Sequence, residues 1–296
     1  MNARLAAVRG RLDAYERLVR LDKPIGILLL LWPTLWGLWL AKDGIPHPLV
    51  LWLFILGTVV TRSAGCAVND FADRNFDAEV KRTQARPLAA GKIHAWEALV
   101  VAAVLGAAAL GIVMQFNNLT IGLSFIAVAI TVIYPFLKRV FWMPQAWLGV
   151  AFGFGIPMAF AAQLGYLPPL AWALLAANIL WTIAYDTEYA MVDRDDDARL
   201  GVHSSALVLG RWDVAGVMAS YALMLALLLA VGVITYRGWP YYLGLAAAAG
   251  MMVYHWRLIR DRTREGCFKA FRHNNWVGAA IFAGLVLSYP FNPSWT

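Results

Sequence analysis

The run Ala98-Leu-Val-Val-Ala-Ala-Val-Leu-Gly-Ala-Ala-Ala-Leu-Gly-Ile-Val-Met114 contains no charged or polar side chain. A helix needs about 20 mostly apolar residues to cross the hydrocarbon core of a bilayer, and segment 95–115 provides them. The apolar residues follow one another without the two-residue alternation of a membrane β-strand. The segment therefore predicts a transmembrane helix and not a barrel strand.

Similar apolar windows recur along the whole chain and leave little room for a soluble domain. Of the 296 residues, 61% are hydrophobic and only 15% are charged, whereas a soluble domain has roughly a quarter of its residues charged. We therefore expect an all-α polytopic membrane protein with a single domain over residues 1–296. Its nine expected spans cover about residues 24–41, 48–68, 95–115, 119–137, 145–163, 169–189, 213–235, 239–256 and 275–290.

Basic residues fall in alternate connecting segments. Nearly all of them lie in the N-terminal segment and in segments 69–94, 138–144, 190–212 and 257–273. The other side offers only Lys42 and Arg237. Because cytoplasmic loops carry the excess of Lys and Arg, we expect the N-terminus in the cytoplasm.

The N-terminal residues 1–23 combine several arginines with apolar residues at helical spacing. This pattern predicts an amphipathic helix on the anionic cytoplasmic leaflet. The segment has no early apolar run, so we expect no cleavable signal peptide.

Acidic residues are concentrated in two places. Ten of the 18 Asp and Glu residues lie in the segments Asp70–Glu79 and Asp186–Asp197. These segments follow the second and sixth expected spans, and an even number of crossings returns the chain to the same face of the membrane. Both are therefore expected in the cytoplasm, and their spacing predicts two four-helix halves with a ninth helix added.

Each acidic segment places three oxygen-bearing side chains at i, i+4 and i+8. They are Asn69, Asp73 and Asp77 in the first segment, and Tyr189, Asp193 and Asp197 in the second. If both segments are helical, each set shares one face of its helix. Acidic residues often only solvate a loop, but like charges at this spacing repel, so two matched faces predict a bound cation. Mg²⁺ suits them, because it takes one or two carboxylates together with substrate phosphates.

Other metals are not indicated by the sequence. Cys66 and Cys267 form no CxxC pair, and the five histidines show no i,i+4 pairing. A zinc site or a disulfide framework is therefore not expected.

Cations near the acidic faces are candidates for holding a diphosphate. They are Lys81, Arg82, Arg86, Lys138, Arg139, Arg194 and Arg199. The positive-inside rule also explains most of them. Arg62 differs, because it falls inside an apolar span where an unpaired charge is expensive and usually functional.

A glycine-rich stretch follows the fourth connecting segment. Gly149, Gly153 and Gly155 are compatible with a substrate tunnel or with close helix packing. Small residues at such spacing let membrane helices approach closely, so we favour packing.

These motifs resemble the UbiA prenyltransferase family. Its signature Asn-Asp-x-x-Asp-x-x-x-Asp matches Asn69, Asp70, Asp73 and Asp77, and its second signature, Asp-x-x-x-Asp, matches Asp193 and Asp197. Further runs look like the branch that acts on 4-hydroxybenzoate: Asp22-Lys-Pro-Ile-Gly26, Val80-Lys-Arg-Thr83, Tyr134-Pro-Phe-Leu-Lys-Arg139 and Tyr185-Asp-Thr-Glu-Tyr-Ala-Met-Val-Asp193. The similarity covers the chain from about residue 15.

The resemblance implies transfer of a polyprenyl group from polyprenyl diphosphate to the ring carbon ortho to the hydroxyl of 4-hydroxybenzoate. The products would be 3-polyprenyl-4-hydroxybenzoate and diphosphate, in ubiquinone biosynthesis. It implies that Asn69, Asp73, Asp77, Asp193 and Asp197 bind Mg²⁺ and that the four aspartates among them are catalytic. The expected substrate-binding residues are Arg62, Asp70, Lys81, Arg86, Lys138, Arg139 and Tyr189.

Two arginines are candidates for binding the acceptor's carboxylate, because the planar guanidinium can bind it bidentately. Arg139 ends the fourth span, and Arg62 lies up to two turns before Asn69. The alternatives are that either arginine holds the diphosphate, and that Arg139 only anchors its span at the membrane surface.

Other functions fit less well. A secondary transporter would place ionisable residues near the middle of the membrane, whereas here they gather at one boundary, and a structural scaffold needs no paired acidic faces. Phosphatidyl-alcohol transferases carry an Asp-Gly-x-x-Ala-Arg signature, which is absent. Another Mg²⁺-dependent aromatic prenyltransferase remains the nearest alternative. The bilayer is an expected partner, while nucleic acid and an obligate protein partner are not.

Overall fold

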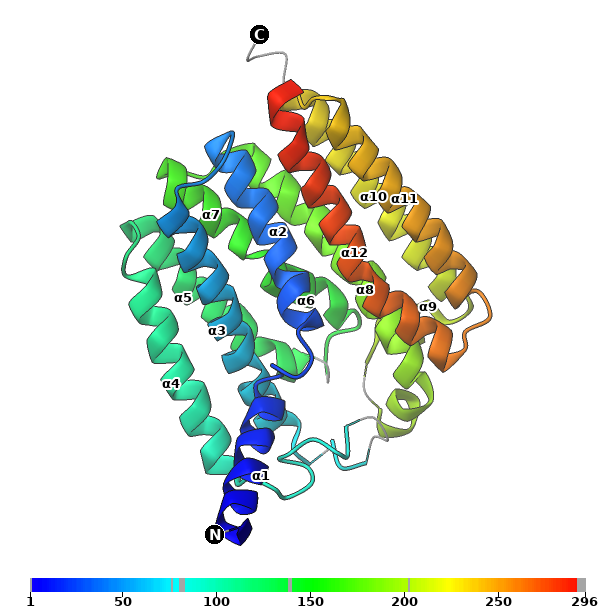
Figure 1. Cartoon of the computed structure of the whole chain (residues 1–296). Helices are drawn as coiled ribbons and strands as arrows, with labels where there is room; N and C mark the ends of the chain where they lie inside the picture. Colours follow the sequence, from blue (N-terminus) through cyan, green and yellow to red (C-terminus); the bar gives the residue numbers. More distant parts are fainter. Residues whose placement is uncertain (1, 76, 80–82, 138–139, 202, 292–296) are drawn as a thin grey trace.

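The computed structural model describes residues 2–75, 77–79, 83–137, 140–201 and 203–291. Within these ranges the chain forms helices and connecting segments and no strand, which confirms the all-α prediction. The longer helices run side by side in one bundle (Figure 1). The helices are α1 (Asn2–Leu18), α2 (Ile25–Lys42), α3 (Pro48–Asp73), α4 (Ala95–Val113), α5 (Asn118–Leu137), α6 (Pro144–Gly153), α7 (Gly155–Leu164), α8 (Pro169–Leu200), α9 (Ser205–Leu209), α10 (Asp213–Ile234), α11 (Trp239–Ile259) and α12 (Arg264–Ser288).

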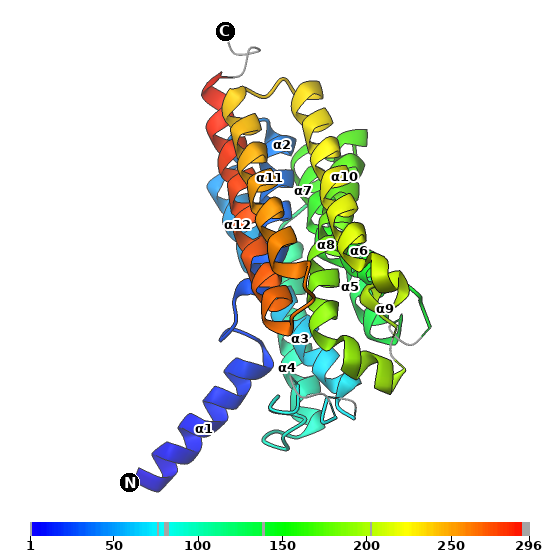
Figure 2. The same ribbon diagram turned by 90° about the vertical axis from the view of Figure 1, so that its right-hand side faces the viewer.

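The protein is a multi-pass membrane protein. Seven stretches of the described chain are long and apolar enough to cross a bilayer. They comprise α2, α3, α4, α5, α6 with α7, α8, and α9 with α10. Helices α11 and α12 contain most of the remaining two expected spans and lie against each other in the bundle (Figure 2), but they are not among these seven stretches. The count of nine spans and the cytoplasmic N-terminus stay predictions.

The fifth expected span is broken into two helices. Helix α6 ends at Gly153 and α7 begins at Gly155, because Pro157 has no N–H with which to continue the helical ladder. A Cβ on Gly149 would lie 2.8 Å from the Ile179 Cα, and one on Gly153 would lie 2.5 Å from the Asn178 Nδ2. These contacts with α8 favour close helix packing, and not a substrate tunnel, as the role of these glycines.

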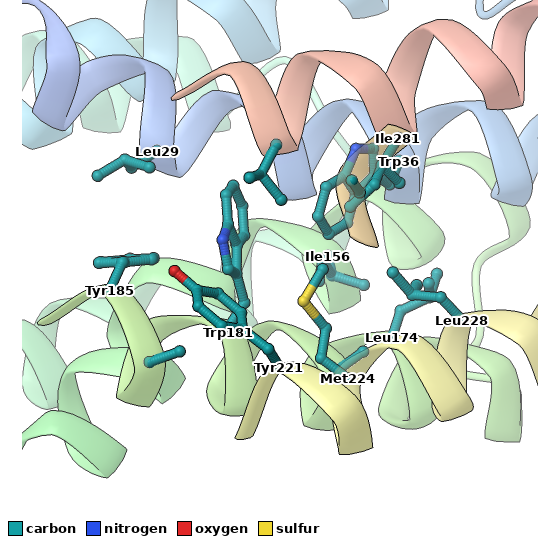
Figure 3. Close-up of a cluster of buried hydrophobic side chains, with 14 of the residues drawn as sticks. Leu29, Trp36, Ile156, Leu174, Trp181, Tyr185, Tyr221, Met224, Leu228 and Ile281 are labelled. Carbon is teal, nitrogen blue, oxygen red and sulfur yellow. The ribbon is translucent and has the colours of Figure 1, made fainter. Parts of the chain in front are cut away.

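Buried aromatic side chains pack α2 against α8 in the core of the bundle. Trp36 of α2 stacks on Trp181 of α8 with ring centroids 5.3 Å apart, and both rings are fully enclosed (Figure 3). Tyr185 meets Trp181 edge-on from the same helix. Helix α2 also packs against α12, so the N-terminal and C-terminal helices close the bundle around α8. The predicted duplication into two halves is not decided by this packing and stays a prediction.

Helix α1 lies below the bundle and runs obliquely away from it (Figure 2). Its last turns pack Ala14 and Leu18 against Ala67 of α3 and against Ile93 and Ala98. An exposed apolar row consists of Leu5, Val8 and Leu12. Attachment of this row to a leaflet stays a prediction.

Candidate active site

The first acidic segment begins at the end of α3. The Asn69 Nδ2 donates a 3.2 Å hydrogen bond to the Asp73 Oδ2, so these two side chains share one helix face as predicted. The α-helix itself ends at Asp73, but the Asp77 N–H donates to the Asp73 carbonyl at 2.9 Å, as in a further helical turn. That Asp77 continues the same face stays a prediction. The Thr83 hydroxyl donates to the Asp77 carbonyl (2.8 Å), and the Asp77 carboxylate pairs with Arg86.

Asp77 and Asp70 share one arginine. The Arg86 Nη1 lies 2.7 Å from the Asp77 Oδ2 and 3.0 Å from the Asp70 Oδ1. Burial raises the pKa of the Asp77 carboxyl, and the Arg86 guanidinium acts in the opposite direction. Arg86 was expected to hold a diphosphate, but in the structure its charge is placed between two carboxylates.

Asp70 is bound on its other side by Arg20, which follows α1. The Arg20 Nη2 donates to the Asp70 Oδ1 at 2.8 Å and to the Oδ2 at 3.0 Å. The Asp70 side chain is almost fully enclosed. These ion pairs favour a structural role for Asp70 over the expected contact with substrate, which stays a prediction.

The second acidic segment is helical throughout. Helix α8 runs to Leu200, so Tyr189, Asp193 and Asp197 share one face as predicted. Tyr189 stacks on Phe271 of α12 with centroids 4.4 Å apart. The helix ends at Gly201, whose left-handed backbone (φ +65°) suits glycine and whose N–H donates to the Asp197 carbonyl.

Two other carboxylates of this segment, Asp195 and Asp196, pair with arginines. Asp196 pairs with Arg199, and Arg264 of α12 lies 3.1 Å from Asp195 and 3.4 Å from Asp196. Arg194, one of the expected phosphate cations, instead pairs with the buried Asp213 at 2.9 Å. These ion pairs indicate structural roles for Arg194, Arg199 and Arg264.

Charged residues of both acidic segments lie within electrostatic range of Tyr134 on α5. They are Asp73 of α3 and Asp186 of α8, and Arg62 of α3 lies within the same range. Neither Tyr134 nor Asp186 was among the site residues predicted from the sequence. The signal was present, since Tyr134 opens one of the family-like runs and Asp186 opens the second acidic segment.

Arg62 lies inside the bundle, where the sequence placed it. Its guanidinium stands 5.3 Å above the Phe152 ring, and a Cβ on Gly26 would collide with its Nε at 2.8 Å. The Arg62 Nε is buried and has no hydrogen-bond partner among the described residues. A held guanidinium with an unsatisfied donor is suited to a carboxylate or phosphate oxygen.

A hollow of about 300 Å³ opens beside the second face. It is lined by Asp197, Ala198, Gly201, His203, Ser204, Leu207 and Val208. The Ser204 hydroxyl is buried and finds no partner in the described part of the chain. Neither His203 nor Ser204 was among the site residues predicted from the sequence.

Several expected cations cannot be placed. Lys81, Lys138 and Arg139 lie outside the described residues, as does Arg82. Their predicted contacts with substrate therefore stay predictions.

The donor set fits Mg²⁺ bound together with a phosphate ligand. No group of three or more His, Cys, Asp or Glu side chains close enough to hold a metal exists among the described residues. Mg²⁺ does not require such a cage, because it binds through one or two carboxylates, water and substrate phosphates. Asn69 with Asp73, and Asp193 with Asp197, each offer oxygen ligands of this kind.

Comparison with known proteins covers nearly the whole chain. The model of the UbiA prenyltransferase family matches residues 30–288. The 4-hydroxybenzoate octaprenyltransferase of Cupriavidus necator is 59% identical over 279 residues, which cover 94% of this chain and 98% of that one. The enzyme of the same name from Nitrosospira multiformis is 60% identical over 279 residues, which cover 94% of this chain and 96% of that one.

Solved structures show the same fold. A UbiA homolog from Aeropyrum pernix superposes with a TM-score of 0.78 at 25% identity, covering 88% of this chain and 97% of that one. A UbiA homolog from Archaeoglobus fulgidus bound to GPP and Mg²⁺ gives a TM-score of 0.65 at 17% identity, covering 90% of this chain and 99% of that one.

Proposed function

The chain belongs to the UbiA prenyltransferase family, and from that premise we propose that it prenylates 4-hydroxybenzoate with a polyprenyl diphosphate. The product is 3-polyprenyl-4-hydroxybenzoate, a ubiquinone precursor. The observation that carries this proposal is the 59% identity to the Cupriavidus necator enzyme over nearly the full length of both chains. Asp73 and Asp186, one from each acidic segment, both lie within electrostatic range of Tyr134, which supports the chemistry.

The reaction exchanges one bond for another. The allylic C–O bond of the donor breaks, and its electron pair leaves with the diphosphate. The ring carbon ortho to the hydroxyl supplies the electron pair of the new C–C bond, and loss of the ring proton restores the aromatic system. The residues must therefore stabilise the highly charged diphosphate that leaves and protect a cationic prenyl group from water.

Mg²⁺ would be held by Asn69 and Asp73 on α3, by Asp77 after it, and by Asp193 and Asp197 on α8. When bound, it supplies neutralisation of the diphosphate charge as the C–O bond breaks. Asn69 and Asp73 lie at the C-terminal end of α3, and Asp193 and Asp197 lie in the last turns of α8, which supports the assignment. Arg86 lies beside Asp77 and adds positive charge to the same region.

The bundle supplies the remaining requirement. The interior around Trp36, Trp181 and Tyr185 is apolar and closely packed, so it keeps water away from a site at its end. The donor's hydrocarbon tail stays in lipid while its diphosphate reaches the acidic segments. We assign the protein to a bacterial inner membrane with these segments in the cytoplasm, supported by the basic residues of the same loops.

The proposal is tested with membranes that contain the protein, supplied with 4-hydroxybenzoate, a prenyl diphosphate and Mg²⁺. Mass spectrometry should detect the acceptor plus one prenyl group, and the same membranes without the protein should not produce it. Benzoate, which lacks the hydroxyl, serves as the matched acceptor and should give no product. Prenylation of other phenols but not of 4-hydroxybenzoate would point to another aromatic prenyltransferase.

A further inference from the structure

Helix α1 and the residues after it lie outside the segment matched by the family model, which begins at residue 30. Nevertheless, they contact the first acidic segment. Arg20 reaches the buried Asp70, and the Arg17 Nη2 donates to the Ala85 carbonyl (2.9 Å), in the loop that carries Arg86. Leu18 packs in the same buried cluster as Ala67 of α3.

Arg20 has an unusual backbone. Its φ is +61°, in the left-handed region that non-glycine residues rarely adopt. Its side chain is anchored at both ends of the guanidinium, with Nη1 donating to the Arg17 carbonyl at 2.6 Å and Nη2 donating to Asp70. Such a conformation persists where the surrounding contacts determine it.

The charges around Asp70 form a chain of four groups. Asp70 accepts from both Arg20 and Arg86, and Arg86 in turn donates to Asp77. A buried carboxylate needs a compensating positive charge. Because Arg20 supplies a positive charge to Asp70, Arg86 can also pair with Asp77 and add positive charge beside it.

We propose that Arg20 is a positioning residue for the transfer reaction, and that α1 holds Asp70, Arg86 and Asp77 in their positions relative to one another. Arg20 acts through Asp70 and Arg86. This inference rests on the proposed function, because it describes how the site that binds the diphosphate is held.

The substitution Arg20→Ala removes one of the two arginines that pair with Asp70 among the described residues. Asp70 then draws Arg86 away from Asp77. The KM for the polyprenyl diphosphate and the Mg²⁺ concentration for half-maximal activity should each rise on the order of tenfold. The KM for 4-hydroxybenzoate should stay unchanged, and Arg20→Lys should restore part of the loss.

Arg11→Ala is the matched control. Arg11 also ties α1 to the bundle, through an ion pair with the buried Glu97 of α4, but among the described residues it forms no hydrogen bond or ion pair with the acidic segment. If α1 only helps the protein to fold, Arg11→Ala and Arg20→Ala should lower the thermal midpoint and the activity alike. That result would overturn the proposal.

The double variant Arg20→Ala, Asp70→Asn is the sharpest test. It removes the uncompensated charge and should leave a lower KM for the diphosphate than Arg20→Ala alone. Equal or additive losses would refute the coupling through Asp70. Wild-type kinetics in Arg20→Ala would refute the positioning role while leaving the transferase assignment intact, whereas an inactive wild-type protein would reject the proposed function itself.

Discussion

Asn274 of α12 donates a 2.8 Å hydrogen bond from Nδ2 to the Glu188 Oε2 on α8, inside the membrane-spanning part of the bundle. The Tyr221 hydroxyl of α10 donates to the other carboxyl oxygen at 3.0 Å and lies 3.0 Å from the Nδ1 of His255 on α11. All four side chains are fully buried. Glu188 lies about 140° around α8 from Asp193, at roughly 100° per residue, so this network holds the back of the helix whose front carries the acidic face.

We expect Tyr221→Phe to destabilise the protein by about 1–3 kcal/mol, because it leaves a buried carboxyl group with one partner fewer. Tyr241→Phe is the control, since the equally buried Tyr241 donates only to the Leu228 carbonyl at 2.8 Å. Membrane hydrogen bonds of this kind contribute about 0.6 kcal/mol on average. Thermal unfolding in detergent should therefore show the larger fall for Tyr221→Phe, and equal falls would contradict the network's special role.

Asp73→Ala and Asp193→Ala should each reduce turnover about 100-fold or more while the protein still inserts and folds. The reason is the loss of one oxygen ligand from each acidic face. EDTA should have the same effect on the wild-type protein, and added Mg²⁺ should restore activity. Asp195→Ala is the control in the same segment, because Asp195 is exposed and pairs with Arg264. Full activity in metal-free buffer would exclude the metal assignment.

The predicted topology is open to cysteine labelling. Variants Asn75→Cys and Asp195→Cys, made without Cys66 and Cys267, should react with an impermeant reagent only from the cytoplasmic side. Ile45 is exposed in the α2–α3 connection, at the end of the bundle away from α1 (Figure 1), and Ile45→Cys should react only from outside. Labelling of Asn75→Cys or Asp195→Cys from outside would invalidate the site model.

Spans were predicted well because their signal is local. Each apolar segment must satisfy its own backbone N–H and C=O groups by forming a helix, whatever segments lie next to it. The break at Phe154 was missed, because the prediction treated Gly153 and Gly155 as packing residues and ignored Pro157 three residues into the second helix.

Site residues were harder to predict because their roles depend on partners distant in sequence. The spacing of Asp193 and Asp197 was sufficient to place them on one face of α8. Asp77 pairs with Arg86, nine positions later, and Asp70 is enclosed by Arg20, fifty positions earlier. No helical periodicity carries that information.

The last prediction concerns the acceptor's carboxylate. Arg62 has a buried Nε with no partner among the described residues, held between Gly26 and the Phe152 ring. Arg62, Asp73 and Asp186 all lie within electrostatic range of Tyr134, so Arg62 is in the same part of the bundle as a residue from each acidic segment. An arginine fixed in this way can bind a carboxylate without first losing side-chain freedom.

We expect Arg62→Ala to raise the KM for 4-hydroxybenzoate about 10- to 100-fold, because a charge-assisted hydrogen bond is lost. The KM for the polyprenyl diphosphate should change much less. Arg62→Lys should rescue only partly, because an ammonium cannot reproduce the planar fork. Arg74→Ala is the matched control, since Arg74 caps the same helix and stacks on Phe71. Arg139→Ala tests the other candidate. If both Arg62→Ala and Arg139→Ala weaken binding of the diphosphate alone, another group binds the carboxylate and the assignment fails.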